Sequence, residues 1–130
     1  LHFKYMPHAV FTEPEIASVG LTEQKAKEQN IQYVTTTTNW IASAKAMSLR
    51  LDYPVTKFII NPKNYEILGC HMIGPESSTM MHQVLAVMHI NNDLRHLKEM
   101  LYIHPALSEA LLPAAVEAVR EVEKYNKNLV

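Results

Sequence analysis

Apolar and polar residues alternate with different periods along the chain, and the changes of period mark its elements. Residues 9–11 and 16–21 read as two extended segments around a proline-bearing turn. Residues 22–30 read as a helix, because Thr22 can cap its free N–H groups and the stretch is rich in Glu, Gln, Lys and Ala. The β-branched run within residues 31–40 then favours a strand.

The firmest local prediction is a β-hairpin in the middle of the chain. Residues 55–61 and 66–73 are apolar and rich in β-formers, and the Pro-Lys-Asn-Tyr stretch at 62–65 joins them. Residues 43–53 show neither a helical nor a strand period clearly, so their structure is left open.

After the hairpin the pattern predicts a long helix over residues 77–91, capped by Ser77 or Ser78. Past its first turn the only polar residues before Asn91 are two histidines and a glutamine, so apolar side chains cover most of its circumference. One sheet face covers only one side of such a helix, and a second copy of the chain is the simplest cover for the rest. The side chains expected in this dimer contact are Met80, Met81, Val84, Leu85, Val87 and Met88.

The last third of the chain predicts two further helical stretches. Residues 106–112 begin a helix, and Pro113 should kink it or start a new one that runs to about Lys124. The tail from 125 to 130 is expected to fray. The whole pattern predicts a single α+β domain over residues 1–130, with an antiparallel sheet of about four to five strands packed against helices.

Composition narrows the function classes. Lys and Arg number 12 and Asp and Glu 13, and the net charge of −1 gives no electrostatic footprint for nucleic acid or an anionic membrane. The chain has no apolar run near the length of a membrane span. Its one cysteine, Cys70, allows neither an internal disulfide nor a cysteine-based zinc site. We therefore expect a soluble, cytoplasmic protein with no nucleic-acid or membrane partner.

A metal site is not expected either. His82, His89 and His96 recur every seven residues, but seven residues of helix rise by about 10 Å, which is too far for two ligands of one ion. A polar stripe or interface histidines are the better interpretation. Cys70 lies mid-strand in the hairpin pattern, where a buried, inert thiol is the simplest role.

The strongest candidate for chemistry is the stretch at residues 102–109, where His104 precedes Pro105 and lies five residues ahead of Glu109. Helical side chains lean toward the N-terminus of their helix, so a carboxylate in the first turn can reach an imidazole on the incoming segment. Such a carboxylate fixes the tautomer and stabilises the imidazolium, as a proton-shuttling histidine requires. Taken alone, these residues also fit a capped helix start with an incidental histidine.

Three motifs in the same order carry a resemblance to a known family: residues 10–23, residues 67–75 and residues 103–109. With them, the chain resembles the C-terminal dimerisation domain of the FAD-dependent pyridine nucleotide-disulfide oxidoreductases, which include dihydrolipoamide dehydrogenase, glutathione reductase and mycothione reductase. The resemblance spans roughly residues 7 to 118. It implies the dimerisation-domain fold of these FAD- and NAD-linked reductases.

The resemblance also implies that two subunits share the catalytic site. In enzymes similar to this chain, electrons pass from NAD(P)H through FAD to a redox disulfide, and a histidine of the other subunit handles the thiol protons. His104 matches that histidine and Glu109 its carboxylate partner, which makes both expected catalytic residues. His104 and Pro105 match a cis peptide whose backbone lies near the partner subunit's flavin, and the implied assembly is a two-fold homodimer.

What the chain lacks limits what it can do alone. Among its three glycines there is no Gly-x-Gly-x-x-Gly, so the chain has neither the FAD nor the NAD(P) phosphate turn, and the redox cysteine pair is missing. We therefore expect a domain of a larger flavoprotein, with its FAD and NAD(P) domains elsewhere, that binds neither cofactor and is inactive by itself. A dihydrolipoamide dehydrogenase-like parent is favoured. A mycothione or glutathione reductase-like parent, or a stand-alone, non-catalytic dimerisation module, remains the alternative.

One residue departs from the family pattern. Many members have threonine after the His-Pro pair, where its hydroxyl can cap the helix, but this chain has Ala106. We therefore expect Glu109 to divide its hydrogen bonds between His104 and free backbone N–H groups.

Overall fold

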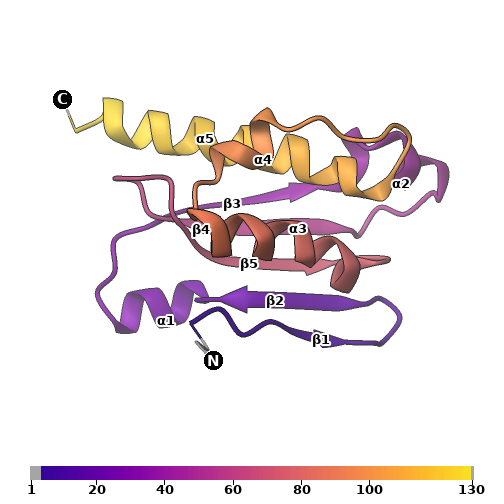
Figure 1. Ribbon diagram of the computed structural model, residues 1–130, viewed down its shortest axis with the longest axis horizontal. Helices are drawn as coiled ribbons and strands as arrows, with labels where there is room; N and C mark the ends of the chain where they lie inside the picture. The colour runs from indigo at the N-terminus through magenta and orange to yellow at the C-terminus, as the bar shows by residue number, and fades with distance from the viewer. Residues whose placement is uncertain (1–3, 130) are drawn as a thin grey trace.

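The computed structural model describes residues 4–129 and arranges five strands in one antiparallel sheet (Figure 1). Their order is β1-β2-β5-β4-β3, which puts β5 at the centre and β1 and β3 at the edges. The predicted α+β fold with four to five antiparallel strands is confirmed. The strands are β1 His8–Val10, β2 Ile16–Gly20, β3 Val34–Asn39, β4 Val55–Ile60 and β5 Ile67–Ile73.

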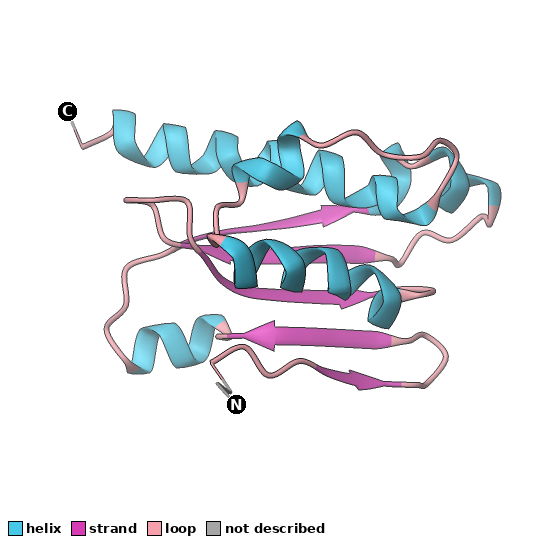
Figure 2. Ribbon diagram, in the orientation of Figure 1, coloured by secondary structure: helices cyan, strands magenta, loops and turns pink. Residues whose placement is uncertain are grey.

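Helices α3, α4 and α5 cover one face of this sheet (Figure 2). α3 packs on β1, β2 and β5, α5 packs on β3 and β4, and α4 packs on α5. The helices are α1 Glu23–Glu28, α2 Ala44–Ser48, α3 Ser77–Ile90, α4 Arg95–Glu99 and α5 Leu111–Lys127, with the 3-10 turns η1 Trp40–Ala42 and η2 Leu107–Ala110. Within residues 4–129, no helix combines the length and apolarity needed to cross a bilayer.

The core lies between the sheet and this helical layer. Phe58 of β4 is fully buried there, because strand alternation sends every second side chain toward the helices. Trp40 is also buried, and its Nε1 donates to Thr56 Oγ1 at 2.9 Å. Gly74 makes room for the indole, since a Cβ at this position would lie 2.7 Å from the Trp40 ring. Trp40, which was expected to end the strand, instead begins η1 and anchors it to the sheet. The stretch 43–53, which the sequence left open, then contains the short helix α2.

The predicted hairpin is confirmed as β4 and β5. Two asparagines close its turn: Asn61 Oδ1 accepts from the backbone N–H of Lys63 at 3.0 Å, and Asn64 Oδ1 accepts from the N–H of Glu66 at 3.1 Å. Asparagine side chains readily mimic a backbone turn in this way, which explains why the local signal was reliable.

α3 begins at Ser77 as predicted, but the predicted serine cap is wrong. The N-cap position is Glu76, in a left-handed conformation with φ 58°, and it makes no side-chain cap. The N–H of Ser78 instead donates to Oε1 of Glu15 at 2.7 Å. Glu15 belongs to the β1–β2 turn, so a carboxylate distant in sequence caps the helix and lies at the positive end of its dipole.

The expectation that most apolar side chains of α3 remain uncovered is also wrong, although Ile90 at its C-terminal end is 81% exposed. Five of the six residues assigned to a dimer contact are 0–8% exposed within this one chain, and Val87 is half-buried. At the helical repeat, the five lie within an arc of about 140°, which one packed face can cover. The buried residues are Met80, Met81, Val84, Leu85 and Met88, and the outward side carries Thr79, His82, Ala86 and His89. The surface argument for a dimer contact through these residues therefore loses its basis.

The helical stretch predicted from residue 106 begins as η2 at Leu107, but α5 begins at Leu111 instead of Pro113 and ends later than predicted. η2 leads directly into α5, and Pro113 is the third residue of α5, where the missing N–H of a proline is well tolerated. α5 continues to Lys127 instead of fraying from residue 125. The Asn126 amide donates to the Pro62 carbonyl at 3.0 Å, and the Gln32 side-chain amide donates to the Tyr125 hydroxyl. Residue 130 of the predicted frayed tail lies outside the described residues.

Candidate active site around His104

The candidate site lies on the loop between α4 and η2, residues 100–106. Leu101 and Ile103 are 97% and 81% exposed, whereas Tyr102 between them is half-buried. The Tyr102 hydroxyl donates to the Leu97 carbonyl at 2.7 Å, and burial raises the pKa of Tyr102 to about 12. The phenol therefore stays neutral near pH 7 and keeps this bond. Tyr102 ties the loop to α4, and His104 follows it on the exposed side.

The structure brings His104 and Glu109 together. Nδ1 of His104 lies 2.9 Å from Oε1 and 3.0 Å from Oε2 of Glu109. The His104 side chain is 68% exposed and that of Glu109 20%, and within residues 4–129 His104 Nε2 has no hydrogen-bond partner. The peptide bond before Pro105 is cis, as the resemblance implied.

The charge state of Glu109 determines which nitrogen of His104 carries the proton. The backbone N–H of Ala106 donates to Glu109 Oε2 at 3.0 Å, and this bond, followed by the bond to His104, lowers the pKa of Glu109 below its usual value. An ionised carboxylate only accepts hydrogen bonds, so Nδ1 carries the proton and Nε2 presents a lone pair to the solvent. The pair can therefore take up a proton at Nε2 while Glu109 stabilises the resulting imidazolium.

Ala106 leaves the capping of η2 half complete. Glu109 is the third residue of η2 and accepts from the Ala106 N–H, which is one half of a capping box. Alanine has no hydroxyl for the other half, and the Glu109 N–H donates to the Ala106 carbonyl at a long 3.3 Å. The predicted division of Glu109 between His104 and a backbone N–H is confirmed, and the contact with His104 survives it.

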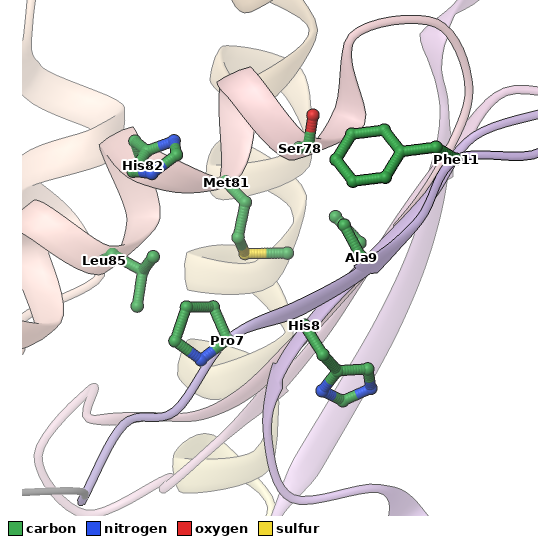
Figure 3. Close-up of a pocket in the computed structure, with 9 residues that line it drawn as sticks. Pro7, His8, Ala9, Phe11, Ser78, Met81, His82 and Leu85 are labelled. Carbon is green, nitrogen blue, oxygen red and sulfur yellow. The ribbon is translucent and has the colours of Figure 1, made fainter.

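An apolar hollow of about 210 Å³ lies elsewhere, between α3 and the N-terminal strand (Figure 3). Met81 and Leu85 of α3 line one side, and Phe11 lies beyond β1 on the other. His8 and His82 also line this hollow, but no carboxylate does. It therefore cannot build a second histidine–carboxylate pair.

The other residues singled out by the sequence lie apart from His104. No group of His, Cys, Asp or Glu in residues 4–129 is arranged to hold a metal ion. His82 and His89 lie on the outward side of α3, as a polar stripe would. Cys70 is fully buried, and burial raises the pKa of its thiol, which keeps it protonated and unreactive near pH 7.

Sequence reasoning missed Ser43. This residue is 2% exposed, and its hydroxyl donates to the Ala106 carbonyl at 3.3 Å. The same oxygen accepts from the Ala46 N–H at 3.4 Å and thereby caps α2. A serine ahead of Ala-Lys-Ala-Met can indicate a helix cap, but no local signal predicts its contact with Ala106, 63 residues away.

Comparisons with known proteins bear on the whole chain. The family described as "Pyridine nucleotide-disulphide oxidoreductase, dimerisation domain" matches residues 6–115. Dihydrolipoyl dehydrogenase 3 of Haloarcula marismortui is 31% identical over 126 residues, covering 97% of this chain and 26% of that protein. Dihydrolipoyl dehydrogenase of Rhizobium etli is 32% identical over 117 residues, covering 90% of this chain and 24% of that protein. The chain therefore spans about a quarter of the length of these relatives.

Solved structures agree with this match. A copper(II) complex of RclA, described as an HOCl-induced flavoprotein disulfide reductase of Escherichia coli, has a TM-score of 0.81 and 27% identity, covering 88% of this chain and 26% of that one. LpdA of Mycobacterium tuberculosis has a TM-score of 0.81 at 20% identity, covering 90% and 26%, and supports the fold alone. Because the family match takes in most of the sequence, this chain belongs to the dimerisation-domain family of the pyridine nucleotide-disulphide oxidoreductases.

Proposed function

We propose that this chain is the dimerisation domain of an FAD-dependent NAD(P)H:disulfide oxidoreductase of the dihydrolipoamide dehydrogenase kind. In this proposal it lends His104 and Glu109 to the flavin and disulfide site of a partner subunit. The observation that carries it is the Glu109 carboxylate on Nδ1 of His104, with Nε2 of the same ring free and exposed. Dihydrolipoyl dehydrogenases and a disulfide reductase among the relatives support the reaction class.

The chemistry of the pair suits thiol–disulfide exchange. The thiolate is the nucleophile in such exchange, so a base that removes the thiol proton raises the reactive fraction. His104 Nε2 takes that proton, while Nδ1 keeps its own proton and donates it in the hydrogen bond to Glu109. The Glu109 carboxylate stabilises the positive charge of the resulting imidazolium. In the reverse step Nε2 returns the proton to the leaving thiolate.

The residues of this chain could contact one side of a flavin, but they do not form its binding pocket. His104 and Pro105 are both exposed and follow one another on the projecting loop, so their backbone is free to face a flavin held by another subunit. Bound FAD would supply the electrons that NAD(P)H delivers to the disulfide. The phosphate-binding turns for FAD and NAD(P) would come from other domains of the parent.

The test uses His104→Ala in the full-length parent. Loss of a general base should slow disulfide reduction by roughly 10²–10⁴-fold, while flavin reduction by NAD(P)H stays near the parental rate. His82→Ala is the matched control, because His82 is exposed and no carboxylate in residues 4–129 bonds it. Stopped-flow measurement separates the two half-reactions. Equal slowing of both would make His104 structural, and no slowing of either would favour the non-catalytic module.

A homodimer is part of this proposal, and the loop before His104 is its candidate contact. Leu101 and Ile103 are 97% and 81% exposed, and two apolar side chains of this size on one short loop favour burial against a partner. Leu101→Asp with Ile103→Asp should convert a dimer to a monomer in gel filtration with light scattering. Leu129→Asp is the control, because Leu129 is 68% exposed but follows the C-terminal end of α5, whereas the loop lies before the start of that helix. A double variant that stays dimeric would place the contact elsewhere.

A further inference from the structure

Ser43 stands out because its neighbours are exposed while it is buried. Ile41 is 54% exposed and Lys45 is also exposed, but Ser43 is 2% exposed, with Trp40 and Ala46 buried on the same side. Its hydroxyl lies between two elements that are distant in sequence. The oxygen accepts from the Ala46 N–H of α2, and the O–H donates to the Ala106 carbonyl.

Ala106 is the residue through which this contact reaches the candidate site. Its N–H donates to Oε2 of Glu109, and its carbonyl accepts from Ser43 and from the Glu109 N–H. Both backbone polar atoms of Ala106 are therefore hydrogen-bonded by other residues, because the methyl side chain of Ala106 can make no hydrogen bond. Two hydrogen bonds thus connect the buried Ser43 hydroxyl to the carboxylate that holds His104.

The histidine depends on such ties because packing does little to hold it. Ile103, His104 and Pro105 are all exposed, and Ala106 has an extended backbone (φ −143°, ψ 155°) ahead of η2. The orientation of the imidazole therefore rests on Glu109 and on the backbone next to it. Catalytic groups must be held within about 0.5 Å of their working position, so a loose Ala106 would reduce the rate.

We infer that Ser43 is a positioning residue for the His104–Glu109 pair, which it serves by fixing the Ala106 carbonyl from α2. Contacts of η1 and α2 with η2 agree with this role, and Figure 1 places α2 at the same end of the molecule as the loop. The inference rests on the proposed function, because it assumes that His104 acts in disulfide reduction. Ser43 itself touches no reacting atom.

The experiment uses the full-length parent and Ser43→Ala. Because a hydrogen bond of 3.3 Å is long, the expected loss is modest, about three- to tenfold in the disulfide half-reaction, with flavin reduction by NAD(P)H unchanged. Ser43→Thr keeps the hydroxyl and should restore most of the rate. The effects of Ser43→Ala and Glu109→Gln should be less than additive, because both act through the same carboxylate.

Two controls separate positioning from simple weakening of α2. Ser48→Ala removes an exposed α2 hydroxyl that bonds the Lys45 carbonyl and should leave both rates unchanged. Ala44→Gly weakens the helix but keeps the Ser43 hydroxyl, so it should slow disulfide reduction less than Ser43→Ala does. If the alanine variant does not accumulate, Ser43→Cys replaces it, because cysteine has nearly the same size but is a poor donor.

The outcomes are distinguishable. The inference is overturned if Ser43→Ala reacts like Ser48→Ala, if Ala44→Gly is equally slow, or if Ser43→Ala slows both half-reactions alike. If His104→Ala leaves disulfide reduction unchanged, the proposed function fails instead, and the role of Ser43 in that reaction fails with it. Selective slowing by Ser43→Ala, with recovery in Ser43→Thr, supports the inference.

Discussion

Replacing Ala106 with threonine should stabilise the chain by completing its half-formed capping box. Ala106 already has the extended backbone of an N-cap residue, with φ −143° and ψ 155°, and its N–H is already bonded to Glu109. The missing part is an acceptor for the Glu109 N–H, which now makes only a 3.3 Å contact with the Ala106 carbonyl. A hollow of about 280 Å³ lined by Ala106, Thr79 and Ser108 gives the new side chain room.

The size of the effect follows from this geometry. A good N-cap stabilises a helix by about 0.5–2 kcal/mol relative to alanine. Because the Glu109 N–H already has a weak partner, we expect the lower half of that range, about 0.5–1 kcal/mol. For a chain of this length, that corresponds to a rise in Tm of roughly 2–4 °C.

Thermal unfolding of the purified chain followed by circular dichroism measures this change. Ala106→Val is the matched control, because valine has the shape of threonine but no acceptor, and it should not raise the Tm. Equal Tm values for the threonine and valine variants would refute the capping argument, since shape alone would then account for any change.

Three further predictions follow from the same structure. Glu15→Ala should lower stability by about 0.5–2 kcal/mol in urea titrations, because it uncaps α3 at Ser78, whereas Glu13→Ala next to it should be neutral; equal losses would show that Glu15 is no cap. Since the folded-state pKa of Glu109 lies below its usual 4.5, its interactions add stability above that value and lose it as the pH falls through the folded pKa. The stability difference between the parental chain and Glu109→Gln should therefore shrink in urea titrations at progressively lower pH, and a constant difference would contradict this reasoning. Cys70 should react with a thiol reagent only after denaturant is added, and rapid labelling of the native chain would show that it is not buried.

Features fixed by residues close together in the sequence could be predicted, whereas features fixed by distant residues could not. The β4–β5 hairpin was predictable because Asn61 and Asn64 close it with bonds spanning two residues. The cap of α1 was predictable for the same reason, since Thr22 accepts from the Lys25 N–H three residues on. The five-residue spacing of the histidine and glutamate at the candidate site also lies within the reach of neighbouring side chains.

The environment of α3 shows where such reasoning stops. The count of apolar residues suggested a helix that one chain could not cover, but the five long side chains project into one arc and pack on β1, β2, β5 and α4. Counting composition without projecting each residue around the axis overstated the uncovered surface. Conversely, Leu101 is the most exposed of the large apolar residues in the described part of the chain, and it lies with the exposed Ile103 on a loop with no periodic signal.

The sequence by itself predicted the antiparallel sheet, the positions of α1, α3 and the C-terminal helix, and a possible contact of His104 with Glu109, because alternation, turn residues and side-chain reach act over a few residues. It did not predict α2 or α4. Only the tertiary structure decided how those elements are held together. Glu15 caps α3 and Ser43 holds Ala106, each across 63 residues of sequence. Such contacts exist only after the sheet has brought distant segments to one place, because a polar group pairs with whichever neighbour the folded chain supplies.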